Sequence, residues 1–304
     1  MKNPHIPKYL NPGDEVRIVS PASCAEPGYI EQTRTALQQL GYNVSLGEYV
    51  LSEHFQFAGT DYQRTMDMQN AIDSESVKAV FCARGGYGSV RIIDKLNFDK
   101  FISAPKWIIG FSDITVFHAH LNQNLGIATI HSPMPVNANS KYFAENLNQL
   151  NELLSGRTEA ISLAAHELNR FGSTEGILTG GNLSILYSLQ ATPYAPEVNN
   201  NILFIEDVGE QLYHLDRMMN NMRLSGKLQK LSGMILGQFT AMQDKKRPFG
   251  KSAYEIITDY TRDLNIPVYF GFQAGHTENN RPFMLGRKVE LTVDTNGATL
   301  SYVN

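Results

Sequence analysis

Several features that mark particular protein classes are scarce in this chain of 304 residues. Two cysteines, Cys24 and Cys82, offer neither a disulfide framework nor a metal-binding spacing. No H-E-x-x-H sequence occurs, so a helix-borne zinc site is not expected. The 26 basic and 30 acidic residues give a formal net charge of −4, which provides no electrostatic footprint for nucleic acid.

Long apolar runs are lacking as well. No stretch approaches the roughly 20 apolar residues of a membrane span. Residues 1–7 contain no apolar core of signal-peptide length. We therefore expect a soluble, cytoplasmic protein without a membrane or nucleic-acid partner.

The composition is otherwise that of an ordinary globular protein, with 42% hydrophobic and 18% charged residues. Single cores rarely keep growing past about 250–300 residues, so the chain is long enough for two domains. We expect an N-terminal domain over residues 1–155, a linker over 156–171 and a C-terminal domain over 172–304.

Apolar strands alternate with amphipathic helices in the first half of the chain. This pattern predicts an α/β domain whose parallel sheet is covered on both faces. Reactive groups gather at the carboxyl ends of the strands in such sheets. The expected strands are Glu15–Ser20, Tyr42–Leu46, Val77–Ala83, Lys106–Ile109 and Ile127–Ile130. The expected helices are Tyr29–Leu40, residues 60–72, Ser89–Leu96 and residues 112–122.

The second half has a less legible topology, because its strands and helices do not alternate as regularly. Its expected strands are Glu175–Leu178, Ile202–Glu206, Gly233–Leu236 and Val289–Val293. Its expected helices are Asn182–Leu189, Gln211–Leu224 and Ala253–Leu264.

Three polar residues, Ser112, Glu206 and His276, lie on separate segments, each where a predicted strand gives way to a loop. A nucleophile, an acid and a base in that setting are what acyl transfer by a serine hydrolase requires. Such triads recur on unrelated folds in different chain orders, and serine, acid, histidine is one of them.

Ser112 has two interpretations. A serine at the start of a helix most often serves as its N-cap. Gly110, two residues earlier, instead permits a sharp turn that exposes the hydroxyl beside the N–H groups of the helix N-terminus. The match to the hydrolase motif G-x-S-x-G is incomplete, because Ile114 stands at the second glycine.

The loop Arg84–Gly88 (Arg-Gly-Gly-Tyr-Gly) lacks the Lys-Ser/Thr of a P-loop and the third glycine of a dinucleotide motif. Its adjacent glycines could instead bring a backbone N–H close to a ligand. Next to Ser112, the N–H of Gly86 is a candidate for half of an oxyanion hole, and a plain tight turn is the alternative. Arg84 is a candidate for binding a substrate carboxylate, or for a structural pair with a nearby acid.

Glu206 and Asp207 are adjacent, so on a regular strand they would point to opposite faces. Asp207 and Glu210 resemble a helix-capping pair, which leaves Glu206 without an ordinary structural task. A carboxylate there could orient an imidazole. His276, in a glycine-bounded loop, is the preferred base, although a lone loop histidine is more often solvated. His131 also follows a strand and ranks below it.

Five motifs occur in one order along the chain. They are Arg84–Gly88, Gly110–Thr115, Gly180–Leu183, Ile205–Glu210 and the loop of Gly275 and His276. Each is weak alone, but the ordered set is specific. Over nearly its whole length, the chain resembles the LD-carboxypeptidase family, the muramoyl-tetrapeptide carboxypeptidases.

The resemblance implies a triad of Ser112, Glu206 and His276, with an oxyanion hole formed by the N–H groups of Gly86 and Asp113. It also implies a flavodoxin- or Rossmann-like N-terminal domain, a swivelling-type C-terminal β/α domain that carries the acid and base, and a homodimer.

The activity implied by this family is removal of the terminal D-alanine of peptidoglycan tetrapeptides during cytoplasmic cell-wall recycling. Such a reaction requires no metal and no organic cofactor, so none is expected. Asn182, in the Gly-Gly-Asn motif, joins Arg84 as a candidate substrate-binding residue.

Two other functions stay open. The family includes relatives that hydrolyse microcin-type peptidyl or aminoacyl nucleotides and give self-immunity. These would need an aromatic platform for the base, whereas Trp107, on a predicted strand, is expected in the core. A non-catalytic α/β protein would bind peptides or sugars at the same crevice without turnover.

Overall fold

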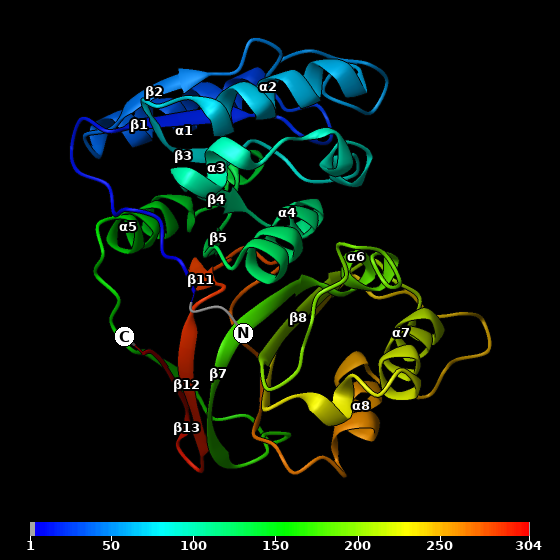
Figure 1. The fold of residues 1–304 in the computed structure, drawn as a ribbon. Helices are drawn as coiled ribbons and strands as arrows, with labels where there is room; N and C mark the ends of the chain where they lie inside the picture. Colours follow the sequence, from blue (N-terminus) through cyan, green and yellow to red (C-terminus); the bar gives the residue numbers. More distant parts are fainter. Residues whose placement is uncertain (1–3, 304) are drawn as a thin grey trace. The chain divides into compact units, whose positions relative to one another are not determined.

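The computed structural model describes residues 4–303, which divide into two compact units (Figure 1). Unit 1 contains the chain up to Arg157 together with Glu278–Gly286. Unit 2 contains Thr158–Thr277 and the chain from Arg287 onward. Within residues 4–303, no helix is long and apolar enough to cross a membrane.

Unit 1 is an α/β domain built on a six-stranded sheet. Five parallel strands follow the order 2-1-3-4-5 of flavodoxin-like sheets. These strands are β2 (Asn43–Leu46), β1 (Glu15–Val19), β3 (Val77–Cys82), β4 (Trp107–Gly110) and β5 (Thr129–His131). Every residue of β4 is buried, as expected of a central strand covered on both faces. The predicted parallel α/β fold is thus confirmed.

Among the helices of unit 1, α1 packs with α5 and α2 packs with α3, whereas α4 contacts β4. These helices are α1 (Pro27–Gln39), α2 (Asp61–Asp73), α3 (Asp99–Ser103), α4 (Thr115–His120) and α5 (Phe143–Leu154). Thr60 opens α2 with the capping box that its sequence predicts, in which Gln63 bonds back to the Thr60 backbone.

Two segments differ from the helices expected in this unit. Residues 89–96 form the short 3-10 turns η1 (Ser89–Arg91) and η2 (Ile93–Lys95), because Ile92 leaves helical geometry at φ −121°. The segment after β4 is a 3-10 turn, η3 (Ser112–Ile114), followed by α4 and the π turn η4 (Leu121–Leu125).

The sixth strand of unit 1 comes from the far end of the chain. Strand β11 (Phe283–Leu285) pairs antiparallel with β5, and its red ribbon stands out in Figure 1 beside the green of β5. Residues 278–286 therefore belong to unit 1, although the sequence placed them in the C-terminal domain. Three residues carry too little pattern to show their pairing partner.

Unit 2 is built on a seven-stranded mixed sheet of order β10-β9-β8-β7-β12-β13-β6. Its first four strands are parallel, and β12, β13 and β6 continue the sheet in antiparallel pairs. The strands are β6 (Ile161–Ala164), β7 (Gly172–Asn182), β8 (Ile202–Val208), β9 (Gly233–Thr240), β10 (Val268–Phe270), β12 (Lys288–Asp294) and β13 (Gly297–Tyr302). Strand β6 lies within the segment expected to be a linker.

The helices α6 (Leu183–Ser188), α7 (Leu212–Leu224) and α8 (Ala253–Thr261) belong to unit 2. Helix α6 contacts β7 and β8, and α7 contacts both α6 and α8. Asn182, at the end of β7, caps α6 through its side-chain oxygen. The start of α6 therefore lies at the carboxyl edge of the parallel strands, where it contacts both β7 and β8.

Arg64 on α2 ties together two loops at the carboxyl edge of the unit 1 sheet. Its residue is 1% exposed. Its Nη1 donates to the carbonyl of Pro21, after β1, at 2.8 Å and to that of Gly88, after β3, at 2.9 Å. Its Nη2 pairs with Asp61. Burial lowers the pKa of Arg64, and the Asp61 carboxylate opposes this change.

Replacing Arg64 should therefore destabilise unit 1. Arg64→Met leaves the carbonyls of Pro21 and Gly88 without their donor, while Asp61 keeps Arg91 and Lys95, so the free energy of unfolding should fall by about 3 kcal/mol. Trp107, the single tryptophan, lies in unit 1 and reports its unfolding in urea by fluorescence.

Arg91→Met is the matched control, because it also removes a cation from Asp61, but one whose side chain is 46% exposed. Its cost should be about 0.5 kcal/mol. Equal losses in the two variants would show that Arg64 does not tie the loops.

Candidate active site

Ser112 directly follows the Phe111 that ends the extended path of β4, and it adopts a left-handed conformation with φ +61°. Such a conformation in a non-glycine residue costs roughly 1–3 kcal/mol and persists where the surroundings fix it. Ser112 is the first residue of η3, whose N-cap is Phe111, so it is not the helix cap. A strained serine between a strand and a helix is the geometry of a nucleophile elbow.

The turn before Ser112 is held by a buried histidine. Gly110 has φ +158°, and a Cβ there would lie 2.9 Å from Cγ1 of Ile114. The Gly110 carbonyl lies 2.9 Å from Nε2 of His118, whose Nδ1 lies 2.8 Å from the Thr129 hydroxyl. Burial lowers the pKa of His118 to about 4. His118 is therefore neutral near pH 7 and donates from Nε2 as an anchor of the turn.

The glycine loop Arg84–Gly88 lies against Ser112, as the oxyanion-hole hypothesis requires. A Cβ on Gly85 would lie 2.9 Å from Cβ of Ser112 and 3.2 Å from the backbone nitrogen of Asp113. Gly86 has φ +89°, and a Cβ there would lie 2.3 Å from Oγ of Ser23. Only a residue without a side chain fits either position.

The side chain of Asp113 connects the nucleophile turn to the end of this loop. It is 1% exposed, and its Oδ2 accepts a hydrogen bond from the Ser89 N–H at 2.8 Å. Burial raises the pKa of Asp113, and the hydrogen bonds from Ser89 oppose the rise. Asp113 thus links the turn at Ser112 to Ser89, which directly follows the glycine loop.

Arg84 lies at the start of the same loop and is half-buried. Its Nη1 donates to the carbonyl of Cys24 at 3.0 Å. Within the part of the chain that the structure describes, Arg84 forms no ion pair, so the structural pairing with an acid is not observed. Its charge remains a candidate for a substrate carboxylate.

In unit 2, a buried carboxylate holds a histidine. Oε2 of Glu206 lies 2.7 Å from Nδ1 of His276 and accepts the His276 backbone N–H at 3.3 Å. The side chain of Glu206 is fully buried, whereas that of His276 is 22% exposed. With Nδ1 as the donor to Glu206, Nε2 is the nitrogen that can accept a proton.

Glycines make this close approach possible. Gly275 has φ +113°, and a Cβ there would lie 2.7 Å from Oε2 of Glu206. A Cβ on Gly237, in the neighbouring strand β9, would lie 3.0 Å from Cβ of Glu206. The sequence shows both glycines, but their task becomes visible only in the packing.

Both acidic residues at the end of β8 are buried, because the strand is bulged there. The register with β9 shifts between Ile205 and Asp207, so Glu206 and Asp207 do not alternate between faces. The Asn182 amide donates to Oε1 of Glu206 at 3.2 Å and to Oδ1 of Asp207 at 3.0 Å. Burial first, and the charge of Glu206 second, raise the pKa of Asp207 to about 6.

These contacts contradict the role expected for Asp207 and give Asn182 a role besides the expected one. The prediction that Asp207 caps the following helix is wrong, because the N-cap of α7 is Gln211 and Asp207 instead accepts the Ser184 N–H of α6 at 2.9 Å. The side-chain nitrogen of Asn182 donates hydrogen bonds to the two carboxylates, and its side-chain oxygen accepts one from a backbone N–H of α6. This gives it a positioning task that the sequence did not reveal.

The electrostatics favour a protonated His276. Burial alone would lower its pKa, but the hydrogen bond and charge of Glu206, with a smaller contribution from Asp207, outweigh burial and raise the pKa above 6.5. The pair is thus arranged to stabilise an imidazolium, the ion that forms when a histidine acts as general base.

Two other residues considered in the sequence analysis, His131 and Trp107, are buried. His131 is 1% exposed, and its Nε2 lies 2.9 Å from Oδ1 of the buried Asn280 while its ring stacks on Phe283. Trp107 is fully buried and stacks on Tyr9, which confirms its place in the core.

A flavodoxin-like unit with a strained serine, and a second α/β unit with a carboxylate-bound histidine, define a protein of the hydrolase class. Comparison with protein families makes this specific. Residues 16–132 match the model of the LD-carboxypeptidase N-terminal domain, and residues 175–291 match that of the LD-carboxypeptidase C-terminal domain. The chain belongs to the LD-carboxypeptidase family, which confirms the resemblance seen in its motifs.

Full-length relatives support this membership. The chain is 34% identical, over 94% of its length and 91% of the relative, to a Bacillus subtilis protein named probable murein peptide carboxypeptidase. It is 32% identical, over 91% of its length and 92% of the relative, to the murein tetrapeptide carboxypeptidase of Pseudomonas aeruginosa.

Solved structures agree. The muramoyltetrapeptide carboxypeptidase of Oxalobacter formigenes matches with a TM-score of 0.87 and 27% identity, covering 95% of this chain and 99% of that one. Another relative, the microcin C7 self-immunity protein MccF of Escherichia coli, is 25% identical over 87% of this chain and 86% of its own.

The Glu206–His276 pair predicts a measurable titration. In protein with isotope-labelled histidine, followed by NMR, the pKa of His276 should lie above 6.5. Glu206→Gln removes the charge and leaves burial, so the pKa should fall below 6.5. Asp207→Asn should lower it less, because Asp207 contributes less. An unchanged pKa in Glu206→Gln would show that the carboxylate does not govern the imidazole.

The same titration fixes the sign of the pH dependence of activity. A general base works only when neutral. Activity that depends on His276 should therefore be lost as the pH falls through its raised pKa, and Glu206→Gln should move this limb of the pH profile to lower pH.

Proposed function

We propose that the protein is a serine-type LD-carboxypeptidase that hydrolyses the amide bond to the terminal D-alanine of peptidoglycan tetrapeptides. The observation that carries the proposal is the bond between the buried Glu206 carboxylate and Nδ1 of His276. This bond orients the imidazole as a base in a chain that belongs to the LD-carboxypeptidase family.

Each proposed residue has one role in the reaction. Ser112 Oγ attacks the carbonyl carbon of the scissile amide while Nε2 of His276 takes the hydroxyl proton. The N–H groups of Gly86 and Asp113 stabilise the oxyanion of the tetrahedral intermediate. His276 then gives its proton to the leaving amine of D-alanine, and the C–N bond breaks.

In the second half of the cycle, water hydrolyses the acyl-enzyme. Water attacks the acyl-enzyme ester as His276 accepts its proton, and collapse of the intermediate returns that proton to Ser112 Oγ and releases the shortened peptide acid. Glu206 keeps the imidazole oriented throughout, and Asn182 keeps Glu206 in place. The mechanism requires Ser112 Oγ and Nε2 of His276 to come within hydrogen-bonding distance in the working enzyme.

The proposed substrate is inferred from the relatives. Two full-length relatives are named for murein peptides, and the names of both include carboxypeptidase. A carboxypeptidase must bind the free carboxylate of its substrate, and Arg84 beside the glycine loop is the proposed partner. A role in cell-wall recycling and a homodimeric assembly belong to the same proposal.

The microcin-type alternative has less support. The MccF relative is more distant, at 25% identity, than the murein carboxypeptidases at 34% and 32%. The sequence offers no clear aromatic platform for a nucleobase, because Trp107, expected in the core, is fully buried. Turnover of an aminoacyl-sulfamoyl adenylate, measured beside a tetrapeptide, separates the two substrates.

The test is mass-spectrometric. Wild-type protein incubated with a muropeptide tetrapeptide should release one alanine and leave a tripeptide. Ser112→Ala should lower kcat by about 10⁴–10⁶-fold, because it removes the nucleophile.

Ser188→Ala is the matched control, since that exposed hydroxyl only bonds the Ile185 carbonyl within α6, and it should leave the rate unchanged. A loss of less than about tenfold in Ser112→Ala would reject the serine mechanism. Product from the adenylate but not from the tetrapeptide would reject the proposed substrate.

A further inference from the structure

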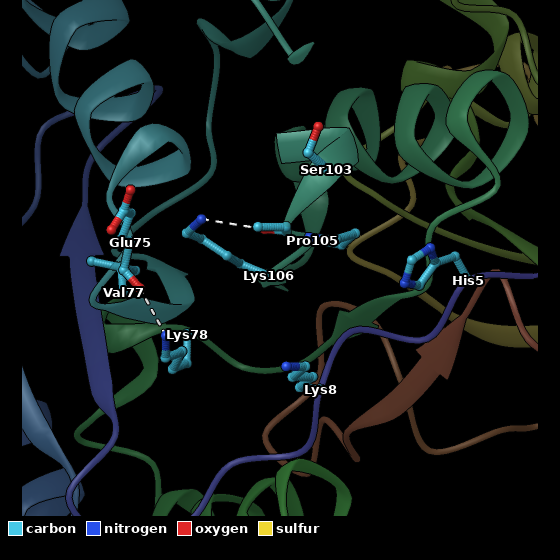
Figure 2. A pocket seen from close by; sticks show the side chains of 9 residues that line it. His5, Lys8, Glu75, Val77, Lys78, Ser103, Pro105 and Lys106 are labelled. Atoms are coloured by element: carbon cyan, nitrogen blue, oxygen red, sulfur yellow. Dashed lines mark hydrogen bonds between the residues drawn. The ribbon is translucent and has the colours of Figure 1, made fainter. Parts of the chain in front are cut away.

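Unit 1 has a cavity at the amino edge of its parallel sheet. Val77 begins β3, and Lys106 immediately precedes β4, so the cavity lies at the opposite ends of the strands that carry the glycine loop and Ser112. Its volume is about 240 Å³. Figure 2 shows the side chains around it: His5, Lys8, Glu75, Val77, Lys78, Ser103, Pro105 and Lys106.

Three of these side chains are lysines, and Asp73 and Glu75 act electrostatically on Lys106 without forming an ion pair with it. Among residues 4–303, no carboxylate forms an ion pair with Lys8, Lys78 or Lys106. Asp73, which acts on Lys106 electrostatically, gives its ion pair to Lys100 at 3.7 Å. Glu75 is the one acid that lines the cavity. The cavity is therefore positive in a chain that is negative overall.

Lys106 is the unusual member of this group. It is only 4% exposed, and its Nζ donates to the carbonyl of Ala104 at 3.3 Å, a long bond for an ammonium group (Figure 2). An ammonium group has three donors, so two remain for another partner. Buried charges in proteins are normally paired, and a cavity beside such a charge is where a counter-ion can bind. Burial also lowers the pKa of Lys106.

The wall of the cavity is fixed rather than loose. The indole of Trp107 donates to the carbonyl of Lys8 at 3.0 Å, and the ring of Tyr9 stacks on that indole. The backbone of His5 pairs with the segment before β5 through the Gly126 carbonyl at 2.6 Å and the Ala128 N–H at 2.9 Å. Nζ of Lys78 is held by the Glu75 carbonyl at 2.7 Å. These contacts fix the backbone around the cavity and the position of the Lys78 ammonium group.

We propose that this cavity, defined by Lys8, Lys78, Lys106 and Glu75, is a binding site for a small phosphate-bearing anion. The lysines supply donors and charge for the oxyanion. Glu75 can accept a hydrogen bond from a protonated phosphate oxygen, a group that a fully ionised dicarboxylate lacks. Binding here involves none of the residues proposed for catalysis, so the site goes beyond the peptidase activity and is tested without turnover.

The test is calorimetric titration of the whole protein with inorganic phosphate at constant ionic strength. Wild type should bind one phosphate per chain with a Kd near or below about 1 mM. Lys106→Gln should weaken binding at least about tenfold, because a hydrogen bond from a buried charged donor is lost. Lys78→Gln, on an exposed side chain, should weaken it about threefold and serves if Lys106→Gln does not fold.

Lys230→Gln is the matched control, an exposed lysine of unit 2 that lies outside the cavity, and it should bind like wild type. Malonate provides the second arm: tighter binding of phosphate supports the phosphate assignment, and tighter binding of malonate overturns it in favour of a dicarboxylate. Absence of saturable binding below about 10 mM, or equal weakening in Lys78→Gln, Lys106→Gln and Lys230→Gln, would overturn the site itself.

Discussion

One buried charge organises the candidate site of unit 2. The Glu206 carboxylate is removed from water entirely, and a carboxylate in such a place is stable only with hydrogen-bond donors around it. His276 and Asn182 are those donors. Gly275 and Gly237 are glycines because a side chain at either would meet the Glu206 side chain. The bulge in β8 and Asn182 at the end of β7 thus both help to hold the Glu206 carboxylate in place.

The choice of partners around Glu206 has a chemical consequence. Asn182 donates to both acids at once, so Asp207 sits beside Glu206 and adds a second negative charge near His276. Burial removes water that would screen these charges, which strengthens their effect on the imidazole. Burial by itself lowers the pKa of His276, but the hydrogen bond and charge of Glu206 outweigh it. The pair therefore stabilises the imidazolium that forms once the neutral imidazole has taken a proton.

Unit 1 holds a serine in a strained backbone conformation. The left-handed Ser112 is held by the turn at Gly110, which His118 anchors, and by Asp113, which reaches across to Ser89. Arg64 supports the far end of the glycine loop through the Gly88 carbonyl. Local strain at Ser112 is thus compensated by buried polar bonds that extend through several elements.

Much of this arrangement was predictable from the sequence, because apolar runs ending in polar residues mark the carboxyl ends of parallel strands. Ser112 and Glu206 stand out on that basis, and β1–β5 follow from the same pattern. The bulge at Glu206 was not predictable, since it depends on bonds to Asn182, which lies far away in the sequence. The same holds for β11, whose partner is β5, and for residues 89–96, where the backbone leaves helical geometry at Ile92.

In the proposed mechanism, His276, oriented by Glu206, activates Ser112. This activation can be measured as the rate at which a fluorophosphonate modifies the protein, with the modified residue identified by peptide mass spectrometry. We expect one adduct, on Ser112, that forms at least about a hundredfold more slowly in His276→Ala. An adduct on another residue, or an equal rate on Ser112 in His276→Ala, would contradict this mechanism.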